Sequence, residues 1–93
     1  DLVAMEVVGE KLQTFFDVLG SRVRHIHLAD GNPSGHYILG DGNLPIQEYI
    51  DTLERNDYTD YLTLEINDSI YWDDPHTSIE KTVNYLRKLI PEV

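Results

Sequence analysis

The chain has 93 residues, no cysteine, and 17 acidic against 7 basic side chains, which gives a formal net charge of −10 at pH 7. This length suits one small domain, and the missing cysteines exclude a disulfide framework, a thiolate nucleophile and a cysteine-based zinc site. The acidic balance disfavours nucleic acids and anionic membranes as partners, and the lack of a leader or a long apolar run leads us to expect a soluble, cytoplasmic protein.

The first half of the chain predicts one helix and one strand. Residues 1–8 carry no turn signal and resemble the interior of a longer protein sequence. A helix is predicted over residues 9–19, with Gly20 suited to end it, because apolar residues recur at helical spacing: Leu12, Phe15, Phe16 and Leu19. A strand follows over about residues 22–29. The next segment, residues 30–43, holds five glycines or prolines and is therefore expected to be a loop.

The second half predicts another helix, another strand and a last helix. Pro45 suits the first position of a helix whose apolar positions are Ile46, Tyr49, Ile50 and Leu53. A strand is predicted over about residues 61–66. After a loop, the last helix is expected to run to about Ile90, since an N-cap residue and a first-turn proline stand at its start: Asp74 and Pro75.

Each predicted strand has one apolar and one polar face, because side chains alternate along a strand. The apolar faces consist of Ile26 and Leu28 in the first strand and of Leu62, Leu64 and Ile66 in the second. His27 and Glu65 lie on the polar faces, at the carboxyl ends. A hairpin needs a much shorter connection than the helix between these strands, so we expect the strands to be parallel.

His27 and Glu65 are candidates for chemistry because active groups of parallel α/β folds gather at the carboxyl ends of the strands. Taken singly, each residue fits better as a hydrogen-bonded histidine or a solvated acid without a role in chemistry. Their occurrence at matching ends of neighbouring strands makes a metal or acid/base site an equal alternative.

Four short motifs occur in order at suitable spacing: His25-Ile26-His27-Leu28-Ala29-Asp30, Gly35-His36, Leu39-Gly40-Asp41-Gly42 and Leu62-Thr63-Leu64-Glu65. Each is weak alone, but together they resemble the carboxyl-terminal part of the sugar phosphate isomerase/epimerase family, which has the xylose-isomerase-like TIM barrel and is related to endonuclease IV. The resemblance covers nearly the whole chain. It implies an α/β fold in which residues 1–93 form a single carboxyl-terminal fragment of a (β/α)8 barrel, with two parallel strands.

The resemblance also implies a metal site. Such epimerases hold a divalent ion, often manganese, magnesium, cobalt or zinc, with two glutamates, an aspartate and a histidine. Asp1, His27 and Glu65 match three of these ligands, and Glu65 also matches one of the two carboxylates that transfer protons. The remaining glutamate belongs to an earlier strand and has no counterpart here, so the chain supplies at most three of four ligands.

Three further residues are predicted to bind substrate: His36, Asp30 and Trp72. Each has a competing interpretation. His36 is equally consistent with a loop histidine that has no role, and Asp30 with a turn-forming aspartate or one that orients His27. Trp72 is equally consistent with packing over a helix.

The function implied by the resemblance is a divalent-metal-dependent sugar or sugar-phosphate isomerase/epimerase of carbohydrate metabolism, which moves a proton next to a carbonyl through an enediolate. With two strands alone, we expect an inactive piece that associates with copies of itself or with the missing barrel part. One alternative is a non-enzymatic acidic α/β module. An abasic-site nuclease like endonuclease IV is disfavoured, because DNA phosphates demand compensating positive charge.

Overall fold

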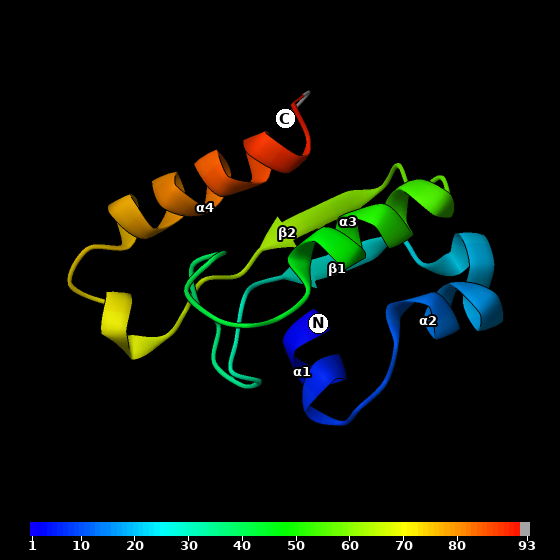
Figure 1. The fold of residues 1–93 in the computed structure, drawn as a ribbon, viewed down its shortest axis with the longest axis horizontal. Coiled ribbons are helices and arrows are strands. Elements are labelled where there is room, and N and C mark those ends of the chain that lie inside the picture. The colour runs from blue at the N-terminus through cyan, green and yellow to red at the C-terminus, as the bar shows by residue number, and fades with distance from the viewer. Residues whose placement is uncertain (92–93) are drawn as a thin grey trace.

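The computed structural model describes residues 1–91. Along the chain the elements are α1 (Leu2–Val7), α2 (Leu12–Leu19), the 3-10 turn η1 (Gly20–Arg22), β1 (His25–Leu28), α3 (Ile46–Arg55), β2 (Tyr61–Leu64), the 3-10 turn η2 (Ser69–Tyr71) and α4 (Pro75–Leu89) (Figure 1). Across residues 1–91 we find no helix with both the length and the apolar character needed to cross a membrane.

The two strands form a parallel pair in which His27 lies opposite Thr63 and Leu28 opposite Leu64. The predicted parallel arrangement is therefore confirmed. Both strands are shorter than predicted, since each has four residues. Within residues 1–91 each strand has one hydrogen-bonded neighbour, which leaves the two outer edges of the sheet unpaired.

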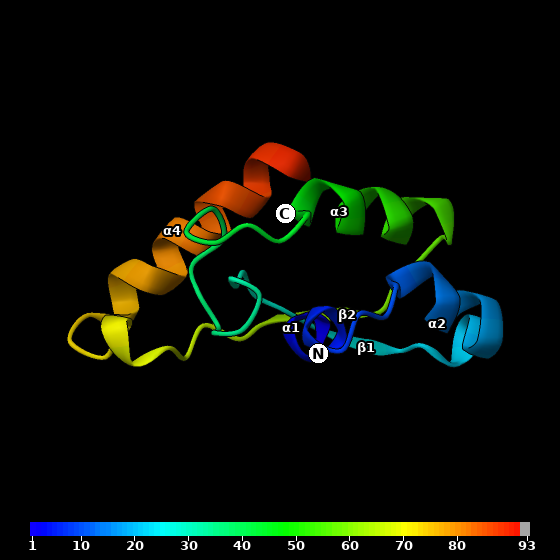
Figure 2. The same cartoon turned by 60° about the horizontal axis from the view of Figure 1, so that its bottom comes forward.

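Helices α3 and α4 lie on one face of the two strands (Figure 2). The apolar side chains of β1 point to this face, where Ile26 and Leu28 are buried in one core with Ile50 and Leu53 of α3. The opposite strand face carries histidine and threonine side chains. The predicted division into an apolar and a polar face is thus confirmed, because the amphipathic helices cover only the apolar side.

Residues 2–7 form a helix that we did not predict, and the helix predicted over residues 9–19 begins later, at Leu12. The signal for α1 lies in Asp1, whose Oδ1 accepts hydrogen bonds from the backbone N–H groups of Val3 and Ala4, at 2.9 and 3.2 Å. Gly9, at φ 77°, separates α1 from α2. Gly20 ends α2 as predicted.

The predicted starts of the other two helices are close to those observed. Pro45 precedes the first residue of α3 and does not itself occupy the first position. Asp74 caps α4, since its side chain accepts from the Thr77 backbone N–H at 3.1 Å, and Pro75 is the first residue of the helix, as predicted.

Two isoleucines that differ sharply in burial allow a test of the core packing. Ile50 is 1% exposed and Ile70 is 69% exposed. We expect Ile50→Ala to lower the free energy of unfolding by about 2–5 kcal/mol through lost burial and a cavity. The same change at Ile70 should stay within about 0.5 kcal/mol. Urea denaturation of both variants measures the difference, and equal losses would contradict the layer arrangement.

Candidate metal centre

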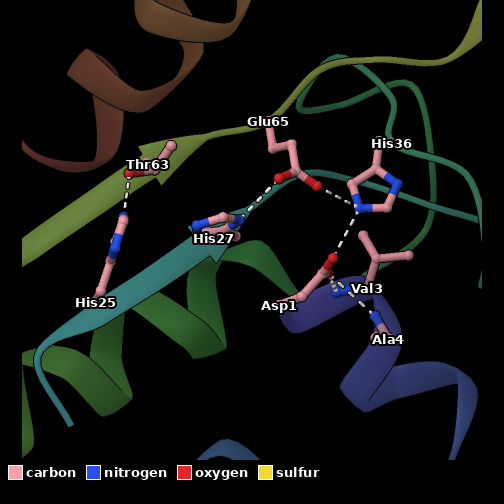
Figure 3. Close-up of polar contacts among 8 residues, drawn as sticks. All are labelled: Asp1, Val3, Ala4, His25, His27, His36, Thr63 and Glu65. Carbon is pink, nitrogen blue, oxygen red and sulfur yellow. Dashed lines mark hydrogen bonds and ion pairs between the residues drawn. The ribbon is translucent and has the colours of Figure 1, made fainter.

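The register of the sheet brings His27 and Glu65 together. Glu65 directly follows β2, and its backbone N–H donates to the carbonyl of Leu28 at 3.0 Å. Its carboxylate then lies beside the imidazole of His27, with 2.8 Å between His27 Nδ1 and Glu65 Oε2 (Figure 3). The two residues predicted at matching strand ends are therefore in direct contact.

The other carboxylate oxygen of Glu65 faces His36, which comes from the loop between β1 and α3. His36 Nε2 lies 3.1 Å from Glu65 Oε1 and 3.0 Å from Asp1 Oδ2 (Figure 3). One ligand atom from each of Asp1, His36 and Glu65 lies within 4.8 Å of the other two. The sequence predicted Asp1 and Glu65 as metal ligands but His36 as a substrate-binding residue. A residue in an irregular loop has no periodicity that indicates where its side chain points.

Asp1 uses its two oxygens for different tasks. Oδ1 caps α1, whereas Oδ2 faces His36. The helix is held in place by its buried residues and by Tyr49 of α3, whose hydroxyl donates to Glu6 Oε1 at 2.5 Å. Burial of the Tyr49 ring, together with this bond, raises the pKa of its hydroxyl far above the usual value, so the phenol remains a donor. The position of the Asp1 carboxylate is thus fixed through α1.

Asp30 has a structural role in the loop between β1 and α3. Its side chain is 2% exposed, and its carboxylate accepts three backbone N–H groups, from Gly31, Gly40 and Leu44, at 2.8, 2.9 and 3.0 Å. A Cβ on Gly42 would lie 2.5 Å from Asp30 Oδ1, so only glycine fits there. These bonds fit the turn-forming interpretation of Asp30, and the predicted contact of Asp30 with substrate stays a prediction.

His25 and Trp72 are not members of this cluster. His25 contacts the Thr63 hydroxyl one layer below His27, and the centroids of the two imidazole rings are 4.8 Å apart. Trp72 is 73% exposed, and its indole N–H donates to the Asn67 carbonyl at 3.2 Å. The predicted contact of Trp72 with substrate stays a prediction.

The cluster fits a divalent cation on chemical grounds. Two carboxylate oxygens approach the same imidazole nitrogen, and a cation at this point would offset the repulsion between their charges. An ion can reach the cluster from solvent, because its side chains and that of the adjacent His27 are between 22 and 37% exposed. Mixed imidazole and carboxylate donors suit manganese, cobalt or zinc, whereas magnesium prefers oxygen donors.

Comparison with known proteins identifies a family and two relatives. Residues 5–89 match the family described as xylose isomerase-like TIM barrels. The chain is 32% identical, over 94 aligned residues, to the fructoselysine 3-epimerases of Escherichia coli O157:H7 and Shigella flexneri. Each alignment covers 99% of this chain and 34% of the relative, so the chain spans about a third of the length of these relatives. No solved structure matches the chain.

The buried carboxylate of Asp30 gives a prediction for the loop. Asp30→Asn replaces one acceptor oxygen by an NH2 group, which then faces a backbone N–H without a bond. We expect the free energy of unfolding to fall by about 1–3 kcal/mol. The exposed Asp73 offers the matched control, and Asp73→Asn should change it by less than about 0.5 kcal/mol. Denaturant unfolding measures both, and an Asp30 variant as stable as the control would contradict the structural role.

Proposed function

The chain belongs to the family of xylose isomerase-like TIM barrels, and from this premise we propose that it forms the carboxyl-terminal part of a divalent-metal-dependent sugar or sugar-phosphate isomerase/epimerase. The observation that carries the proposal is the cluster of Asp1, His36 and Glu65 at the carboxyl ends of the strands. The named activity of the relatives, an epimerase acting on fructoselysine, supports a ketose or a ketose derivative as substrate.

We propose that Asp1, His27 and Glu65 hold the cation and that His36 contributes a further nitrogen. The support for His36 is its Nε2, which faces both carboxylates, and the support for His27 is its contact with the second oxygen of Glu65. Binding of a cation requires the facing imidazole nitrogens to offer a lone pair and not a proton. Manganese, magnesium, cobalt and zinc are the candidate ions.

In this proposal Glu65 also transfers the proton. Epimerisation next to a ketose carbonyl requires a base that removes a proton from the carbon and an acid that returns one from the other side. Glu65 would serve as one of this pair, and the second carboxylate would come from the part of the barrel that this chain does not include. A divalent cation would supply stabilisation of the negative charge that develops on the substrate oxygens.

The proposed partner of the chain is the rest of the barrel. Beside the unpaired edge of β1 lies a mostly apolar groove of about 410 Å³, and its lining includes Leu2, Met5, Phe15, Val23 and Ile26. An unpaired strand edge next to apolar surface favours pairing with a further strand. The preceding strand of the barrel would fill this groove and bring its own carboxylate to the cation.

The metal assignment predicts a loss of binding in four variants. Asp1→Asn, His27→Gln, His36→Gln and Glu65→Gln in the full-length protein should each weaken manganese binding at least tenfold, measured by isothermal titration calorimetry. Glu80→Gln, on the exposed side of α4, serves as control and should bind as the wild type does. Unchanged affinity in Glu65→Gln would refute the assignment of that ligand, and unchanged affinity in one histidine variant would remove that histidine from the set.

The proton-transfer role predicts isotope exchange. With a ketose substrate in deuterated water, the full-length enzyme should incorporate deuterium at the carbon next to the carbonyl, and NMR follows the loss of that proton signal. Glu65→Asp keeps a carboxylate but moves it back by one methylene, so exchange should slow by about 10²-fold. Glu65→Gln should show no exchange on the same time scale, and retained exchange would exclude Glu65 as the acid/base.

A further inference from the structure

Two loops meet at the metal centre, and hydrogen bonds join them away from the ligand atoms. One loop connects β1 to α3 and carries His36; the other follows β2 and carries Glu65. The backbone carbonyl of His36 accepts from the N–H groups of Asn67 and Asp68, at 3.2 and 3.3 Å. The two loops are therefore hydrogen-bonded to each other through the backbone of His36 itself. A displacement of one loop would displace the other.

Tyr71 forms a second connection between the same loops. Its hydroxyl donates to Asp41 Oδ2 at 2.6 Å and accepts from the Ile38 backbone N–H at 3.2 Å. Its ring also packs edge to face against Tyr37, with 6.4 Å between the ring centroids. Tyr37 is the residue next to His36, so the phenol holds the chain on the carboxyl-terminal side of that histidine.

The hydroxyl of Tyr71 stays protonated over the neutral range. Burial, and then the hydrogen bond to Asp41, raise the pKa of Tyr71 to about 12. The phenol can therefore donate to Asp41 at neutral pH. Asp41 itself stands between two glycines that lie against the Asp30 carboxylate, so the bond from Tyr71 ends on a part of the loop that is already fixed.

We propose that Tyr71 is a positioning residue, whose hydroxyl holds the loop between β1 and α3 so that His36 faces Asp1 and Glu65. The proposal rests on the proposed cation site. Without the phenol bonds, the His36 loop keeps its anchor at Asp30 but loses its connection to η2, and the imidazole gains freedom. Tyr71 itself touches neither cation nor substrate in this assignment.

The test is Tyr71→Phe in the full-length protein, which keeps the ring against Tyr37 and removes only the hydroxyl. We expect the manganese dissociation constant to rise about tenfold, faster hydrogen exchange at the Ile38 amide, and shifted imidazole NMR signals of His36. Glu80→Gln, on the exposed side of α4, is the control, and it should change none of these three quantities. Manganese affinity equal to that of the wild type in Tyr71→Phe, or an equal loss in the control, would overturn the proposal.

Variants of Asp41 separate positioning from a general loss of stability. Asp41→Asn keeps an acceptor oxygen for the Tyr71 hydroxyl and should bind manganese within about threefold of the wild type, whereas Asp41→Leu should match the loss in Tyr71→Phe. Equal binding by these two variants would also overturn the proposal. A wild type that binds no manganese would refute the proposed function instead, and the His36 imidazole signals in Tyr71→Phe and Glu80→Gln would then decide the positioning role.

Discussion

The parallel pairing of β1 with β2 is the constraint on which the rest of the structure depends. Leu28 lies opposite Leu64, the last residue of β2. Glu65, which follows β2, therefore lies at the end of the sheet, beside the polar face that carries His27. A shift by one residue would turn Glu65 toward the core and expose Leu64. The same pairing turns Ile26 toward the helices, so the burial that stabilises the sheet also fixes the direction of the polar side chains.

The loop between β1 and α3 adds the second constraint. A long irregular loop leaves its backbone groups without regular partners, and the Asp30 carboxylate satisfies three of them from the inside. The glycines around it permit the close approach of the backbone that these bonds need. These bonds hold the loop from which His36 projects toward the two carboxylates.

The sequence predicted the parts of this arrangement that depend on local signals. Strand alternation and the length of the connection gave the parallel pair and its faces, and the family match confirms the partial TIM barrel. Helix α1 was not predicted because the sequence alone does not distinguish an aspartate that caps a helix from one with another role. In the structure one oxygen of Asp1 caps α1 and the other faces His36. The sequence left alternatives open for Asp30 and His36, because the direction of these side chains depends on bonds between residues distant in sequence.

The uncovered polar face connects the fold to the site. Helices α3 and α4 cover one side of the strands, while the other side carries polar side chains. On that side His25 is hydrogen-bonded to Thr63 of the neighbouring strand, and His27 is hydrogen-bonded to Glu65 (Figure 3). On an isolated sheet such paired polar groups would face water and contribute little stability. Inside a closed barrel the same groups would lie in a region with less water, where their hydrogen bonds and charges act more strongly. The arrangement of polar groups in these strands thus makes physical sense as one wall of a barrel interior, with the cluster of Asp1, His36 and Glu65 at its carboxyl-terminal end.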